Sequence, residues 1–180
     1  MFGSLLFDLA PGVPAAKPLS GAPPPPAAPA GPTPQGIQAL AFLVGGVWAT
    51  TSGAATVSER VVWDATETFL MTEVIQSVSG QPAGLARGYF GYAPAAQTLL
   101  SSALSTSGTY TGGYETSSPD ANTWVFAMMC GSGPNIQSVQ VTMQHASADE
   151  LTIAQAIQVD GAWVTKGSAT YLRQCDPSLA

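Results

Sequence analysis

Charged residues are scarce in this chain, and basic residues are the scarcest. Only 9% of the 180 residues are charged, and five are basic, which leaves a formal net charge of −6. Typical domains carry about 25% charged residues. Binding to nucleic acid or to an anionic membrane surface depends on clusters of Lys and Arg. We therefore expect neither partner, and the surface must be hydrated by Ser, Thr, Gln and backbone groups.

Histidine and cysteine are also scarce, with one histidine and two cysteines in the chain. Common metal sites need several such residues close together. A Ser-His-Asp hydrolase would have to use His145, and no G-x-S-x-G motif accompanies it. His145 is predicted at the tip of a hairpin at 144–147, facing water. We expect no metal, no cofactor and no enzymatic activity.

No apolar run is long enough to span a bilayer as a helix. Apolar residues make up 46% of the chain, which is enough for a hydrophobic core. The first 35 residues differ from the rest, because 22–34 consist almost wholly of Ala, Pro and Gly. Such a segment favours an extended linker. We predict a disordered tail at 1–35; the alternative is the remnant of an export signal, and an exported location is favoured. Residues 176–180 are predicted to form a short C-terminal tail.

The body of the chain, 36–175, is predicted to be all-β behind one short helix. Thr33-Pro34 is a good helix start. Ile37, Leu40, Ala41 and Val44 then form one apolar stripe, and Gly45-Gly46 ends the helix. After Val47 the period changes to two. Strands are expected at 47–52, 55–64, 69–78, 85–92, 98–104, 108–116, 124–130, 136–145, 151–159 and 162–174.

About ten strands joined by short turns predict a closed antiparallel meander barrel, with the helix covering one end. An open sheet would leave two exposed edges, and in a ten-stranded meander the last strand runs antiparallel to the first and can pair with it. A barrel of this size is wide enough to leave room for a ligand. The same topology places Cys130 and Cys175 at opposite ends of the barrel, about 25 Å apart. We therefore predict no disulfide between them.

Two carboxylates lie on apolar strand faces. Glu59 alternates with Val57, Val61 and Trp63, and Glu73 alternates with Phe69, Met71 and Ile75. If both faces look inward, both acids need partners. Arg87 shares a face with Tyr89 on the next strand, which predicts a Glu73–Arg87 pair as an interior polar anchor. The alternative register would place these acids outside.

Gly46-Val47-Trp48 behind a short helix, at the head of an antiparallel meander, resembles the G-x-W signature of lipocalins. The body resembles bacterial lipocalin-like (calycin-type) domains of unknown function, through segments at 43–48, 88–94, 124–126, 149–152, 160–163 and 170–173. The resemblance implies that Arg173 packs over Trp48 at the closed floor and hydrogen-bonds the helix end. Nitrobindin-like haem barrels belong to the same broad group. His145 at a hairpin tip is a poor axial ligand, so haem is not expected.

The leading hypothesis is a lipocalin-like barrel that binds a small apolar or amphipathic ligand in its interior. The alternatives are a packed barrel acting as a structural or interaction module, and an enzyme using Glu59 or Glu73. The predicted ligand-binding residues are Phe69, Met71, Glu73, Arg87, Tyr89, Tyr110, Trp124, Phe126, Met128 and Met143.

Overall fold

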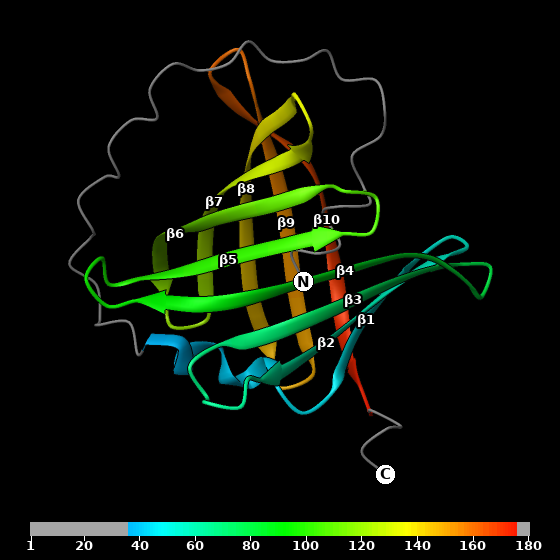
Figure 1. Cartoon of the computed structure of the whole chain (residues 1–180), viewed down its shortest axis with the longest axis horizontal. Helices are drawn as coiled ribbons and strands as arrows, with labels where there is room; N and C mark the ends of the chain where they lie inside the picture. Colours follow the sequence, from blue (N-terminus) through cyan, green and yellow to red (C-terminus); the bar gives the residue numbers. More distant parts are fainter. Residues whose placement is uncertain (1–35, 176–180) are drawn as a thin grey trace.

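The computed structural model describes residues 36–175. The tails predicted at 1–35 and 176–180, and the helix start at Thr33-Pro34, lie outside the described residues. Within the described part, a 3₁₀ helix is followed by ten strands (Figure 1). These are η2 (Gly36–Leu43), β1 (Val47–Ser52), β2 (Ala55–Trp63), β3 (Leu70–Val78), β4 (Gln81–Ala93), β5 (Thr98–Ser105), β6 (Tyr110–Asp120), β7 (Thr123–Ser132), β8 (Asn135–Ser147), β9 (Glu150–Val159) and β10 (Ala162–Gln174).

The strands form a closed barrel in sequence order, with every neighbouring pair antiparallel, as predicted. Closure comes from β10, whose last residues pair with β1: Trp48 lies opposite Arg173, and Ala49 lies opposite Leu172. An even number of strands in a meander brings the first and last strands together with opposite directions. The sheet therefore has no free edge among the described strands.

The turns follow the local sequence signals. Asp160 and Gly161 have φ values of 50° and 83°, the pair of positive angles that a tight hairpin needs at Asp-Gly. Two predicted strand ends were misplaced, the start of the strand at 85–92 and the end of the strand at 108–116. Pro82 lies inside β4, and β6 continues to Asp120 through register shifts after Glu115, because irregular pairing tolerates residues that a regular ladder would exclude.

The segment before β1 is a 3₁₀ helix rather than the predicted α-type stripe. Its buried residues are Leu40 and Leu43, with Ile37 partly buried, which is the three-residue period of a 3₁₀ helix. Ala41 and Val44, predicted on the buried stripe, are only half-buried. Gly45, at a φ of 90°, ends the helix and redirects the chain into β1.

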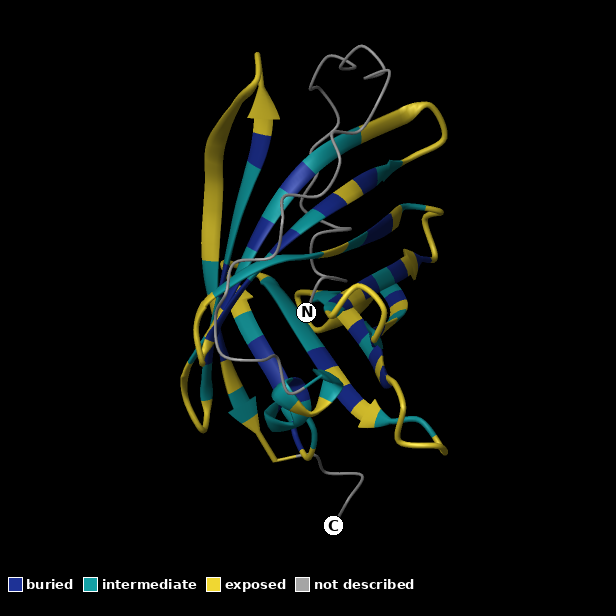
Figure 2. Cartoon of the chain, turned by 90° about the vertical axis from the view of Figure 1, so that its left-hand side faces the viewer, coloured by how far each residue is buried: buried dark blue, intermediate teal, exposed yellow. Residues whose placement is uncertain are grey.

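Burial alternates along the strands, which separates an interior face from an exterior face (Figure 2). On β8 the buried residues are Val139, Val141 and Met143, while Gln140 and Thr142 between them are partly exposed. This alternation makes the barrel interior the hydrophobic core of the protein.

Candidate functional site

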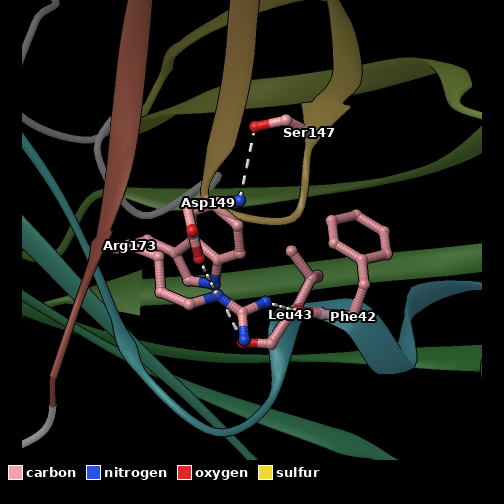
Figure 3. Close-up of polar contacts among 6 residues, drawn as sticks. Phe42, Leu43, Ser147, Asp149 and Arg173 are labelled. Atoms are coloured by element: carbon pink, nitrogen blue, oxygen red, sulfur yellow. Dashed lines mark hydrogen bonds and ion pairs between the residues drawn. The ribbon is translucent and has the colours of Figure 1, made fainter.

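The floor of the barrel is built around Trp48 and Arg173. Figure 3 shows Arg173 reaching from β10 towards Phe42 and Leu43 of η2. Trp48 is fully buried and donates a hydrogen bond from Nε1 to the carbonyl oxygen of Leu43, at 2.9 Å. The guanidinium carbon of Arg173 lies 4.7 Å from the centre of the Trp48 ring, and the guanidinium donates to the carbonyl oxygen of Phe42. The predicted packing of Arg173 over Trp48, and its hydrogen bond to the helix end, are both confirmed.

Phe42 and His145 extend the floor. Their ring centres are 3.9 Å apart and the rings are nearly parallel, and Phe42 also stacks on Trp124 at 5.5 Å. Burial lowers the pKa of His145, and the positive charge of Arg173 lowers it further. The prediction that His145 faces water at a hairpin tip is wrong, because β8 extends to Ser147 and the turn follows it.

Four of the predicted ligand-binding residues face the interior. Trp124, Phe126 and Met128 are buried on β7, and Met143 is buried on β8. Trp124 lies directly opposite Met143, and the Phe126 ring centre lies 6.3 Å from that of Phe90 on β4. These side chains form an aromatic and methionine wall, and their inward placement is as predicted.

The other six predicted ligand-binding residues point outward, so their predicted interior placement is wrong. On β3 the buried residues are Leu70, Thr72 and Val74, so the alternating set points to the exterior. The same holds on β4, where Ala86 and Phe90 are buried, and on β6, where Thr111 is buried. The outward-facing residues are Phe69, Met71, Glu73, Arg87, Tyr89 and Tyr110.

The predicted ion pair between Glu73 and Arg87 does form, but on the outer surface. Arg87 Nε and Nη2 each lie 2.8 Å from Glu73 Oε2. The Arg87 side chain is 73% exposed and that of Glu73 is 41% exposed. A pair this accessible contributes at most about 1 kcal/mol to stability. It cannot serve as a polar anchor in the interior.

Glu59 is the acid that does face inward. It is fully buried, and its neighbours across the ladder are Trp48 on β1 and Val74 on β3. Glu59 and Glu73 therefore lie on opposite faces of the sheet. These two carboxylates cannot share acid–base work in one site.

Several interior polar residues were missed by the sequence analysis. Thr72, Ser101, Ser105 and Thr111 are buried on β3, β5 and β6. Thr111 donates a hydrogen bond to the sulfur of Cys130, at 3.3 Å, and burial raises the pKa of the Cys130 thiol. Small polar residues in strands give no signal of their own, because they occur on either face.

Glu115 is a half-buried acid on β6. Its Oε2 accepts a hydrogen bond from the backbone N–H of Leu99, at 3.3 Å. Burial raises the pKa of Glu115, and this hydrogen bond opposes the rise. A second carboxyl group is thus present at the margin of the core.

One wall of the interior is lined by small side chains in a continuous row. Reading across β3 to β7, the residues directly opposite one another are Thr72, Gly88, Ala103, Thr111 and Cys130. A Cβ atom added to Gly88 would lie 2.7 Å from the Cβ of Ala103. Position 88 thus has no room for a larger residue, and this row is lined by smaller side chains than Phe126, Met128 and Met143 on β7 and β8.

The remaining sequence expectations concern thiols, metals and membranes. Cys130 is buried in β7 and Cys175 is exposed just after β10, and both are free, in the positions the topology predicts. Among residues 36–175, no cluster of three or more His, Cys, Asp or Glu side chains is placed to hold a metal ion. No helix within this range has the length and apolar character required to cross a membrane.

Comparison with known proteins supports the fold alone. No family model matches the chain, and no curated protein matches it. Among solved structures it is similar to Rv2717c from M. tuberculosis, with a TM-score of 0.56 and 16% sequence identity. The match covers 77% of this chain and 96% of that one. At this identity the likeness establishes a shared barrel fold.

Proposed function

We propose that the barrel binds one small amphipathic molecule in its interior, as lipocalin-like barrels do. The observation that carries the proposal is the row of small side chains across β3–β7, facing the interior of a ten-stranded barrel. Eight strands already enclose a space that large side chains just fill. A wider barrel with one wall of small side chains needs something else to complete its packing.

The chemistry of the interior supports an amphipathic rather than a purely apolar ligand. Phe126, Met128 and Met143 offer a large apolar contact area, and Thr72, Ser101 and Thr111 bring hydroxyl groups into the same enclosure. Ligand sites typically combine an apolar lining with a few polar groups that fix orientation. Binding without catalysis fits best, because Glu59 and Glu73 are on opposite faces.

The proposal is tested by native mass spectrometry of the full chain purified from its own host. A bound ligand appears as a retained small mass that is lost on denaturation. We expect Ala103→Leu, which enlarges one side chain of the row, to lower retention about tenfold or more, by excluding the ligand. Ala127→Leu, on the outer face of β7, is the matched control and leaves retention unchanged.

The same two variants separate ligand binding from a fully packed core. If the interior has room, Ala103→Leu leaves the stability of ligand-free protein unchanged or raises it. If the interior is already filled by side chains, the added methylenes cost about 1–3 kcal/mol. No retained mass together with a destabilised Ala103→Leu variant would refute the proposal and favour a packed structural module.

A further inference from the structure

The outer surface of β3–β6 is unusually apolar. Large hydrophobic side chains on it, with Phe69 just before β3, are between 36% and 58% exposed, and we consider seven of them together. We call this surface the apolar outer face; its residues are Phe69, Met71, Tyr89, Leu100, Leu104, Tyr110 and Tyr114. The four strands lie side by side on the viewer's side of Figure 1.

These residues form one continuous patch because the strand register brings them together. Met71 lies directly opposite Tyr89, and Leu104 lies directly opposite Tyr110. The ring centres of Phe69 and Tyr89 are 6.1 Å apart, edge to face. Cross-strand neighbours of this kind touch one another. The apolar outer face is therefore a single surface rather than scattered exposed side chains.

Two glycines let aromatic rings lie against the sheet. A Cβ at Gly91 would lie 2.9 Å from the ring of Phe69, and a Cβ at Gly112 would lie 2.5 Å from Cζ of Tyr110. The rings thus cover backbone where any other residue would push them outward. The result is a broad platform suited to packing against another sheet surface.

The face carries almost no net charge. Its two charged residues, Glu73 and Arg87, are bonded to each other at 2.8 Å. The chain as a whole has a formal charge of −6, so most surfaces of two copies would repel each other. On this face that repulsion is absent, and its arginine is paired with Glu73, so it offers no cluster of basic residues for a nucleic acid or an anionic lipid.

The exposed area is close to what a stable dimer requires. Aromatic side chains bury about 150–250 Å² each, so the exposed fractions of these seven residues correspond to roughly 600 Å². Patches on monomers rarely exceed about 300–600 Å², and a standard interface buries about 800 Å² per partner. Because the barrel is closed, a partner cannot add a strand to an edge.

We propose that the apolar outer face is the interface of a homodimer, in which the β3–β6 surfaces of two copies pack against each other about a two-fold axis. The two-fold arrangement places the same aromatic platform on both sides. It also lets the Glu73–Arg87 pair of one protomer meet its counterpart. This inference does not depend on any interior ligand.

The test is sedimentation velocity of the full chain over a range of concentrations, with Leu104→Lys as the disrupting variant. Leu104 is 58% exposed on the apolar outer face, and Leu172, on the outside of β10, is 54% exposed. Leu172→Lys is therefore the matched control, because it makes the same change at similar exposure elsewhere. A second disrupting variant, Met71→Lys, is independent of the first.

We expect the sedimentation coefficient of the unmodified chain to correspond to a particle of twice the mass of one chain. Leu104→Lys and Met71→Lys should each weaken dimerisation about 30-fold or more, as for a central interface residue, while Leu172→Lys leaves it unchanged. A monomer at about 100 μM would overturn the proposal, because interfaces of this size bind in the micromolar to picomolar range. A dimer weakened equally by Leu172→Lys, or by neither disrupting variant, would also overturn it.

Discussion

Replacing Arg173 with Met tests whether the floor of the barrel depends on one cation. The change keeps an apolar stem and removes the guanidinium, which lies 4.7 Å from the Trp48 ring centre and donates to the Phe42 carbonyl. A cation over an aromatic ring contributes about 1–2 kcal/mol when partly desolvated. A hydrogen bond from a charged donor contributes about 1.5–3 kcal/mol. The contact with Asp149 adds little, because the two groups are 3.9 Å apart and the Asp149 side chain is 78% exposed.

Because these contributions share one side chain and are not additive, we expect Arg173→Met to lower the free energy of unfolding by about 2–4 kcal/mol. For a domain of this length that corresponds to a fall in Tm of roughly 6–12 °C. Urea unfolding followed by tryptophan fluorescence measures the change. The control is Arg87→Met, which breaks an exposed pair and should cost less than about 1 kcal/mol. Equal losses in the two variants, or a loss below 1 kcal/mol at Arg173, would refute the reasoning.

Three further predictions concern titratable groups. Burial raises the pKa of Glu115, so Glu115→Gln should raise the urea midpoint at pH 7, and this advantage should shrink towards pH 4 as the wild-type carboxyl takes up a proton. Burial lowers the pKa of His145 from 6.5, so the folded state resists protonation of this side chain and stability should fall as the pH drops below that value. His145→Gln should make the fall in stability between pH 7 and 5 less steep. An unchanged slope would contradict this. Hydrogen bonds lower the pKa of Asp64 from 3.8 to about 2, and the largest effect comes from the Thr66 hydroxyl. The contribution of Asp64 to the stability of the fold is therefore present above pH 3.8 and is lost between pH 3.8 and 2. Asp64→Ala should lower the urea midpoint at pH 7 and remove that acid dependence.

The number, order and closure of the strands could be predicted because each depends on local signals. The period of two, and turn residues such as Asp160-Gly161, mark hairpins without reference to the rest of the fold. Closure then follows from strand count and the cost of free edges. The type of the helix, 3₁₀ rather than α, could not be predicted from such local signals. Ile37, Leu40 and Leu43 fit a three-residue period, while Ile37, Leu40 and Val44 fit a longer one, and packing against the floor selected the first.

The surroundings of His145 could not be predicted from the local sequence. Its ring is held by stacking on Phe42, a residue about a hundred positions away in the chain. The hydrogen bond from its backbone N–H to the carbonyl oxygen of Asn122, at 2.9 Å, continues the β7–β8 hairpin past the predicted end. The stacking is a long-range contact between η2 and β8, and it has no signature in the sequence around position 145.

The orientation of β3 was the main error in predicting the site. Alternation gives two faces but not which of them is inside, and a shift of one residue exchanges them. Glu59 lies opposite Val74 and Arg60 lies opposite Glu73. Once Glu59 faces inward, Glu73 must face outward. The prediction that both acids are interior required a register in which the two residues share a face, and the hairpin between β2 and β3 does not have that register.

The error arose because β3 is apolar on both faces, whereas β8 is not. The outer face of β8 carries Gln140, Thr142 and Gln144, so its inside is evident from the sequence. On β3 the outer face carries Met71, continuous with the other residues of the apolar outer face. A strand buried on one side by the core and on the other by a second copy has no water-facing side, and so it needs no polar alternation. The proposed dimer accounts in this way for the apolar outer face of β3, and Met71→Lys, which changes that face of β3, tests the explanation by sedimentation velocity.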